Sequence, residues 1–182
     1  MTVSSPSSPP LLTRLDARDR ALFLRWAVAG SATRRVRLLW VVITHIGGAT
    51  CSIIAAIAPR LLGATGELAR ASVQALQTLV ISHLLVQLVK RTVGRPRPSR
   101  AVLIATSVRE PDQFSFPSGH SAAAMSVAFI YALAFPAMAA PLLAIALVVG
   151  MSRVCLGVHY PGDVLVGQAI AVLTGVVVRL LS

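Results

Sequence analysis

The chain has 182 residues, about the length of one domain. It carries 17 Lys and Arg against 6 Asp and Glu, a formal net charge of +11, yet 55% of its residues are hydrophobic and only 13% are charged. A nucleic-acid-binding protein displays its basic residues on a polar surface, and a water-soluble globule could not cover this much apolar surface. The composition excludes both classes, so no nucleic-acid partner is expected, and it indicates an integral membrane protein.

The N-terminal segment and the cysteines carry few functional signals. Residues 1–13 are rich in Ser and Pro and lack the basic start and apolar core of a secretory signal, so we expect a disordered cytosolic tail. Cys51 and Cys155 form no CxxC pair, and we interpret both as buried small hydrophobic residues.

The uncharged runs predict membrane helices. Residues 14–37 alternate charged and apolar side chains, which predicts an amphipathic helix lying in the membrane interface. Five apolar runs of spanning length, or close to it, follow at residues 38–58, 71–89, 118–135, 138–151 and 163–178. The predicted fold is an all-α, polytopic transmembrane helix bundle, with the membrane domain covering residues 38–182.

The distribution of basic residues predicts the orientation in the membrane. Lys and Arg are concentrated in the N-terminal segment and in the loop of residues 90–117, whereas the loop after the first span has only Arg60 and Arg70. Because cytoplasmic loops carry the excess of positive charge, both basic segments are expected on the cytoplasmic side of a bacterial inner membrane.

Three polar clusters interrupt the apolar pattern, at residues 90–98, 117–120 and 152–163. Successive spans alternate in direction, so the end of the second span, the start of the third, the end of the fourth and the start of the fifth share one face of the membrane. The three clusters are therefore expected to converge at that face.

The clusters contain the groups that a phosphate requires. Lys90, Arg97 and Arg153 supply three cations, and an Arg side chain can bind an oxyanion through two parallel hydrogen bonds. Ser118 and Gly119 stand where a helix begins, and free backbone N–H groups there favour an anion. Carboxylates are scarce and no HxxxH or HExxH pattern occurs, so neither a metal nor another cofactor is expected.

Two histidines accompany this phosphate cradle. His159 and Asp163 are four residues apart, which would place them on one face of a helix that extended that far. A carboxylate that holds one imidazole nitrogen leaves the other free to attack phosphorus. His120 is the second candidate for proton transfer, and the pair suits phosphoryl transfer through a phosphohistidine.

The three clusters together resemble the signature of the type 2 phosphatidic acid phosphatase family. The matching patterns are Lys-x6-Arg-Pro, Pro-Ser-Gly-His and Ser-Arg-x5-His-x3-Asp, complete and in order over residues 90–163. That family includes bacterial prenyl-diphosphate phosphatases, phosphatidylglycerophosphate phosphatases and vanadate-dependent haloperoxidases. Many of its membrane members have six spans with the site facing outward, whereas this sequence predicts five spans with the site facing inward.

The resemblance implies a role for each matching residue. His159 would be the nucleophile, Asp163 its orienting partner, and His120 the group that protonates the leaving oxygen and later activates water. The phosphate-binding residues would be Lys90, Arg97, Ser118, Gly119 and Arg153. The family works without a metal.

Other polar residues are interpreted as structural. Arg91, Arg95 and Arg100 are expected to anchor the end of the second span at the membrane surface. His45 and His83 lie within apolar spans, where we expect them to bond to neighbouring helices, although His83 is placed to line the pocket floor. The loop carboxylates of Glu67, Glu110 and Asp112 are assigned to solvent.

The sequence thus predicts a metal-independent membrane phosphatase. Its expected substrate is a prenyl diphosphate or prenyl-linked phosphosugar, then phosphatidate or phosphatidylglycerophosphate; the sequence does not separate them, and it leaves the oligomeric state open. The alternatives are a non-catalytic lipid-binding scaffold and, less favoured, a vanadate-dependent haloperoxidase.

Overall fold

The computed structural model describes residues 11–27, 32–101, 108, 110 and 112–182. In order, its helices are α1 (Leu11–Trp26), α2 (Arg34–Ile46), α3 (Ala49–Leu61), α4 (Gly66–Val93), α5 (Pro98–Ala101), α6 (Gly119–Ala134), the short 3-10 turn η1 (Pro136–Met138), α7 (Ala139–Cys155) and α8 (Pro161–Leu181). An isolated antiparallel bridge joins Pro96 to Phe114. The prediction of an all-α bundle is confirmed.

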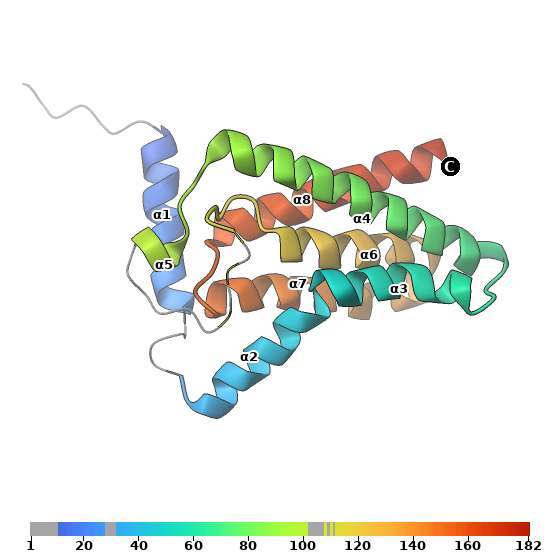
Figure 1. Cartoon of the computed structure of the whole chain (residues 1–182), viewed down its shortest axis with the longest axis horizontal. Helices are drawn as coiled ribbons and strands as arrows, with labels where there is room; N and C mark the ends of the chain where they lie inside the picture. Colours follow the sequence, from blue (N-terminus) through green and yellow to red (C-terminus); the bar gives the residue numbers. More distant parts are fainter. Residues whose placement is uncertain (1–10, 28–31, 102–107, 109, 111) are drawn as a thin grey trace, which may run out of the picture.

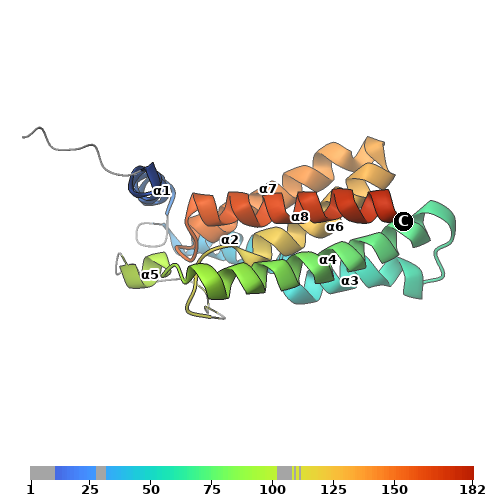
Figure 2. The same cartoon turned by 90° about the horizontal axis from the view of Figure 1, so that it is seen from above.

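Helix α6 forms the centre of the bundle. It packs against α4, α7 and α8, and these helices run side by side along the long axis, with α3 beside α4 (Figures 1 and 2). Its sequence is dominated by small residues that let the neighbouring backbones approach closely. One of them, Ser126, shares a 2.8 Å hydrogen bond with Ser82 of α4 between their hydroxyl groups.

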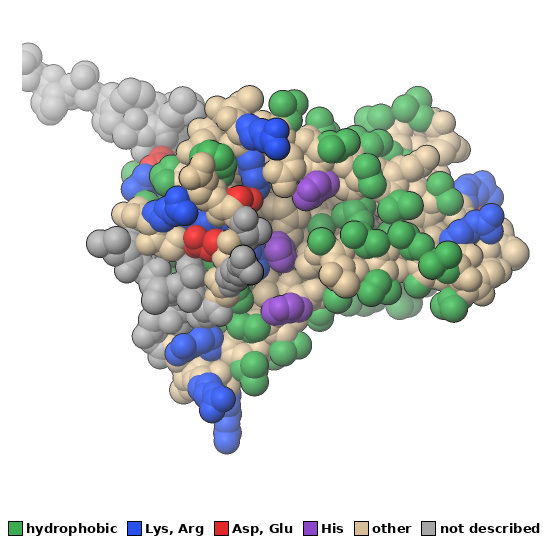
Figure 3. All heavy atoms as spheres, viewed as in Figure 1, with side chains coloured by type: hydrophobic (Ala, Val, Ile, Leu, Met, Phe, Trp, Pro, Cys, Tyr) green, Lys and Arg blue, Asp and Glu red, His purple; other side chains and the backbone are tan. Residues whose placement is uncertain are grey.

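The bundle has the dimensions of a multi-pass membrane protein. Helices α4, η1–α7 and α8 are each long and apolar enough to cross a membrane, and α2 with α3 would form a fourth span bent by 44°. The bend falls at Gly47 and Gly48, between the two helices. The third predicted span is α6, an apolar helix of only 16 residues. Hydrophobic side chains (green) are spread along the length of the helix bundle, and most Lys and Arg side chains (blue) gather at one end (Figure 3).

The N-terminal region differs from its prediction. Residues 14–37 are not one amphipathic helix, because α1 ends at Trp26 and α2 begins at Arg34. Residues 1–10 of the expected tail lie outside the described residues, and residues 11–13 belong to α1. Helix α1 lies across the charged end of the bundle, transverse to α4, α6, α7 and α8, as an interfacial helix would (Figure 1). Cys155 is buried as predicted, but Cys51 is exposed on α3.

Helix α4 is longer than the second predicted span, and its end places the first polar cluster. Gly94 terminates the helix in a left-handed conformation with φ of 62°, which glycine adopts without steric cost. Pro96 and Pro98 follow, and the chain runs along the end of the bundle to the short helix α5 (Figure 1).

A close contact between α8 and the start of α6 fixes the other two clusters relative to each other. A Cβ atom added to Gly167 would lie 2.5 Å from the carbonyl oxygen of Ser118. In the same contact, the N–H of Ser118 donates a 2.9 Å hydrogen bond to the carbonyl of Asp163. Any side chain at position 167 would therefore separate the two segments.

We expect Gly167→Ala to destabilise the fold by about 1–3 kcal/mol, because overpacking against a backbone atom forces the helices apart. The measurement is thermal unfolding of the detergent-solubilised protein. Leu173→Ala is the matched control on the same helix, since Leu173 is 67% exposed. Equal unfolding temperatures for both variants would contradict this account.

Candidate active site

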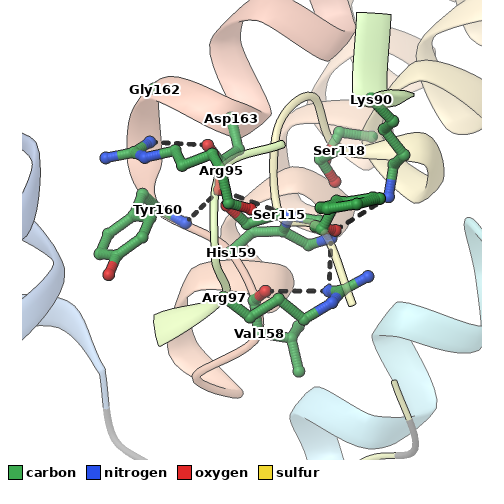
Figure 4. A network of polar contacts seen from close by, with 12 residues as sticks. Lys90, Arg95, Arg97, Ser115, Ser118, Val158, His159, Tyr160, Gly162 and Asp163 are labelled. Atoms are coloured by element: carbon green, nitrogen blue, oxygen red, sulfur yellow. Dashed lines mark hydrogen bonds and ion pairs between the residues drawn. The ribbon is translucent and has the colours of Figure 1, made fainter. Parts of the chain in front are cut away.

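All eight predicted site residues lie at one end of the bundle, where four helix ends meet. Lys90 is in the last turn of α4, Ser118 immediately precedes α6, Arg153 is in the last turn of α7, and Asp163 is in the first turn of α8. Gly119 and His120 begin α6, while Arg97 and His159 come from the connecting segments. Figure 4 shows the core of this arrangement.

His159 and Asp163 face each other, but not on a helix. Helix α8 begins only at Pro161, a residue suited to the first helical position, so the pair meets across the start of the helix. The Nδ1 atom of His159 lies 3.5 Å from Oδ2 of Asp163. The contact is longer than a hydrogen bond, as is common for such pairs before a ligand binds. His159 is 2% exposed and Asp163 is fully buried.

Arg97 approaches the other face of the imidazole. One of its terminal nitrogens is 3.3 Å from Nε2 of His159 and donates a 3.0 Å hydrogen bond to the carbonyl of Val158. Its Nε donates to the carbonyl of Asp112 at 2.8 Å. Arg97 is therefore buried and rigidly held beside Nε2, the nitrogen that does not face Asp163.

Lys90 and Arg97 share an anionic partner that the sequence assigned to solvent. The carboxylate of Asp112 accepts a 2.8 Å hydrogen bond from Nζ of Lys90 and another of 2.8 Å from Arg97. Burial alone would raise the pKa of Asp112, but these two cations hold it below its ordinary value. Asp112 is thus an ionised carboxylate that bridges Lys90 and Arg97, two of the residues predicted to bind phosphate. Glu110 is not free either, since it accepts a 2.6 Å hydrogen bond from Ser99.

The start of α6 provides uncharged donors. Ser118 has an extended backbone, and its hydroxyl bonds to that of Ser121 at 2.9 Å rather than capping the helix. The first backbone N–H groups of a helix have no partner within it, so those of Gly119 and His120 can face an anion.

Arg153 and His120 line a cavity of about 350 Å³ that opens between α2, α6 and α7. Arg153 is 2% exposed and donates a 2.6 Å hydrogen bond to Thr44 of α2. His45 lines the same cavity and is exposed, with its Nδ1 2.6 Å from the carbonyl of Val41 in its own helix. The cavity thus reaches two of the predicted site residues, His120 and Arg153.

His83 does not line this cavity. It faces a separate apolar cavity of about 310 Å³ between α3 and α4, and its Nε2 is 3.4 Å from the side-chain nitrogen of Gln87. The suggestion that His83 lines the pocket floor is therefore wrong. The expectation that His45 and His83 bond to neighbouring helices is also wrong, because the side-chain contact of each is to a residue of its own helix. Elsewhere, Glu67 is bound to Arg179 at 3.0 Å rather than left to solvent.

The predicted role of Arg95 is also wrong. It was expected to anchor the chain to the membrane surface, but its guanidinium contacts three carboxylates, each at 2.7 Å, from Asp16, Asp19 and Asp163. Neither Asp16 nor Asp19 belongs to a motif or shows a spacing that pairs it with Arg95, so the sequence carried no signal of this cluster.

The electrostatic environment keeps His159 neutral. Burial, together with the positive charges of Arg153 and Arg97, lowers its pKa to about 4, although Asp163 acts in the opposite direction. A neutral imidazole has a free lone pair and can act as a nucleophile. Among the described residues, no group of three or more His, Cys, Asp or Glu side chains could hold a metal ion.

Removing the charge of Asp112 should strengthen anion binding. In Asp112→Asn, an incoming oxyanion no longer has to displace a carboxylate from Lys90 and Arg97. We therefore expect orthovanadate to bind about tenfold more tightly, which corresponds to a binding free energy more favourable by roughly 1.4 kcal/mol. Calorimetric titration of the detergent-solubilised protein measures this. Glu110→Gln is the control, and weaker binding to Asp112→Asn would contradict the competition.

The pKa of His159 also predicts a pH-dependent stability. Because about 4 lies below the ordinary value of 6.5, the unfolded chain takes up the proton first, and the fold loses stability as pH falls from 6.5 toward 4. The loss amounts to at most roughly 3 kcal/mol. The measurement is the free energy of unfolding of wild type and of His159→Gln, each at pH 7.5 and at pH 4.5. The variant should lose less stability, and an identical loss in both proteins would refute the assignment.

Known proteins are similar to this chain in sequence and in fold. The decaprenylphosphoryl-5-phosphoribose phosphatase of Mycobacterium tuberculosis is 39% identical over 102 residues, covering 54% of each chain. The lipid A 1-phosphatase of Rhizobium etli is 40% identical over 97 residues, covering 50% of this chain and 42% of that protein. The chain therefore spans about half the length of these curated relatives.

Among solved structures, the fold is similar to that of a PAP2-type phosphatidylglycerolphosphate phosphatase from Bacillus subtilis. The TM-score is 0.72 at 25% identity, covering 91% of this chain and 85% of that one. The sequence model of the PAP2 superfamily matches residues 71–182, which is more than half of the chain and includes every motif of the site. This chain belongs to the PAP2 superfamily.

Proposed function

We propose that the chain is a metal-independent lipid phosphatase that transfers phosphate from a membrane lipid to His159 and then to water. One observation carries the proposal: a neutral imidazole, buried between Asp163 and Arg97, presents Nε2 toward a group of cations. Asp112 bridges two of these cations, so the cradle is already shaped to hold an oxyanion.

In the first step, Lys90, Arg97 and Arg153 bind the phosphate oxygens together with the N–H groups at the start of α6. Nε2 of His159 attacks phosphorus while Asp163 accepts a hydrogen bond from Nδ1–H and stabilises the positive charge that develops on the ring. The negative charge of the bound phosphate favours the protonated form of His120, which takes up a proton when the phosphate binds and then gives it to the leaving oxygen of the lipid.

In the second step, His120 is neutral and takes a proton from a water molecule, which attacks the phosphohistidine. The P–N bond breaks, inorganic phosphate leaves, and both imidazoles return to their starting forms. The cations stabilise the charge on the phosphoryl oxygens in each transition state, which is the main task of a protein in phosphoryl transfer.

The position of the site supports a lipid substrate. Four helix ends hold the phosphate at one end of an apolar bundle, where the tail of a lipid can stay in the bilayer while its headgroup enters between α2 and α6. The relatives are named for a prenyl-phosphate sugar and for lipid A. A prenyl diphosphate or prenyl-linked phosphosugar is the first choice, followed by phosphatidate and phosphatidylglycerophosphate.

We further propose that the site faces the cytoplasm. Helix α1 and the start of α2 lie at the same end as the site, so their arginines and those of the 90–100 segment indicate the same side (Figure 1). The opposite end carries Arg60, Arg70 and Arg179.

Phosphate release by detergent-purified protein in excess EDTA tests the activity. The panel holds prenyl diphosphates, a prenyl-linked phosphosugar, phosphatidate and phosphatidylglycerophosphate. We expect EDTA-resistant release from at least one lipid and a loss of at least a thousandfold in His159→Ala, because the nucleophile is gone. Binding of a lipid phosphate without release from any of the panel would instead indicate a lipid-binding scaffold.

Labelling in sealed cells tests the orientation. In a Cys51→Ala background, which keeps only the buried Cys155, a cysteine introduced at Arg91 marks the site end and one at Leu62 marks the opposite end; Leu62 is 86% exposed. A membrane-impermeant maleimide should label the Leu62→Cys protein and reach the Arg91→Cys protein only after permeabilisation. The reverse pattern would place the site outside.

A further inference from the structure

We propose that Arg95 is a positioning residue for the His159–Asp163 pair, and that helix α1 completes the site by holding Arg95 in place. The inference rests on the proposed phosphatase function and adds to it Arg95, which occupies an unspecified position of the first motif, together with a role for the N-terminal helix.

Arg95 fixes the oxygen of Asp163 that does not face the histidine. One terminal nitrogen of Arg95 lies 2.7 Å from Oδ1 of Asp163. The other carboxylate oxygen, Oδ2, accepts a 2.8 Å hydrogen bond from the N–H of Tyr160 and faces Nδ1 of His159. With both oxygens held, the carboxylate cannot rotate away from the imidazole.

Arg95 also supplies the charge that Asp163 needs. A fully buried carboxylate is stable only beside a positive group, and His159 is neutral before the reaction. Burial by itself would lower the pKa of Arg95, but the negative charge of Asp163 and the other carboxylates raises it above the ordinary value. Arg95 therefore stays charged at every pH at which the fold exists.

The geometry separates Arg95 from the phosphate cradle. Its guanidinium lies beside Asp163 and Tyr160, stacked 4.0 Å above the centre of the tyrosine ring, whereas Arg97 lies at the opposite side of His159 (Figure 4). Its hydrogen bonds within the described part of the chain go only to carboxylates. Any effect of Arg95 on the reaction must pass through Asp163.

Helix α1 holds the other side of Arg95. Asp16 binds one terminal nitrogen of Arg95, and Asp19 binds the nitrogen that also contacts Asp163, both at 2.7 Å. Asp19 accepts a further 2.7 Å hydrogen bond from the N–H of Gly162, the residue before Asp163. One carboxylate of α1 thus touches both Arg95 and the backbone that carries Asp163.

Two further contacts show that α1 is built into the site. Phe23 of α1 is fully buried, and its ring meets that of Tyr160 edge-on with 5.3 Å between centroids. A Cβ atom on Gly162 would lie 2.8 Å from Oδ2 of Asp19, so glycine at this position is what admits the carboxylate. Helix α1 therefore packs on the loop that carries His159.

Kinetics of Arg95→Gln test the proposal, with Arg91→Gln as the matched control because Arg91 is an exposed arginine four residues away. We expect kcat to fall about 10- to 100-fold, the usual cost of losing the partner that orients a reactive side chain. KM and the inhibition constant for orthovanadate should change less than twofold, since Arg95 does not touch the cradle. Arg95→Lys should recover part of kcat, and Arg91→Gln should match wild type.

The Asp16→Asn/Asp19→Asn variant tests the contribution of α1. Arg95 then keeps only Asp163, so kcat should fall by about three- to tenfold, less than in Arg95→Gln. An unchanged kcat in this variant would remove α1 from the proposal.

Three results would overturn the role of Arg95. They are an unchanged kcat in Arg95→Gln, a joint loss of kcat and orthovanadate affinity, or an unchanged NMR signal of the His159 Nδ1–H in ¹⁵N-histidine-labelled Arg95→Gln. The NMR signal needs no substrate, so it tests the positioning of His159 even if wild type released no phosphate, a result that would count against the proposed function alone.

Discussion

Buried charges at one end of the bundle depend on one another, and the rest of the structure serves to keep them paired. Arg97 and Asp163 are fully buried and Lys90 is 4% exposed. An isolated charge at such depth would cost several kcal/mol, so each of these three is tolerated because an opposite charge lies within hydrogen-bonding distance. Arg153 differs, since it is 2% exposed and its hydrogen bond in the described part of the chain goes to the hydroxyl of Thr44. Asp112 forms ion pairs with Lys90 and Arg97, and Arg95 forms an ion pair with Asp163. The helix ends must meet closely to make these pairs, which explains the small residues of α6 and the contact of Gly167 with Ser118.

For the proposed function, the same pairing offers a lipid phosphate a place to bind. A phosphate brings two negative charges and can replace Asp112 on Lys90 and Arg97 without leaving either cation unpaired. The exchange needs little rearrangement of the buried residues, because Asp112 is the more exposed partner, with a third of its side chain accessible. Arg153, held by Thr44 of α2, would complete the proposed binding surface on the side of the cavity between α2 and α6.

The sequence was sufficient to locate the motif residues but not their partners. The three motifs come together because helix direction alternates, a rule that depends only on the order of apolar runs. The Arg95 cluster joins residues 68 to 79 positions apart, and no periodicity links Asp16 or Asp19 to that arginine. An arginine near a membrane surface can meet a lipid headgroup or a carboxylate, and composition does not distinguish these cases. The start of α8 could have been predicted from the sequence, because proline favours the first turn of a helix and residue 161 is a proline.

The central claim is that phosphate passes through a covalent bond to His159. The protein is mixed rapidly with a lipid that carries ³²P in its phosphate, and an alkaline quench preserves any phosphohistidine. A denaturing gel then separates the labelled protein from unbound lipid. The account predicts label on wild type at one site that mass spectrometry maps to His159, and none on His159→Ala. Turnover by wild type without any trapped label, or label that persists in His159→Ala, would contradict it.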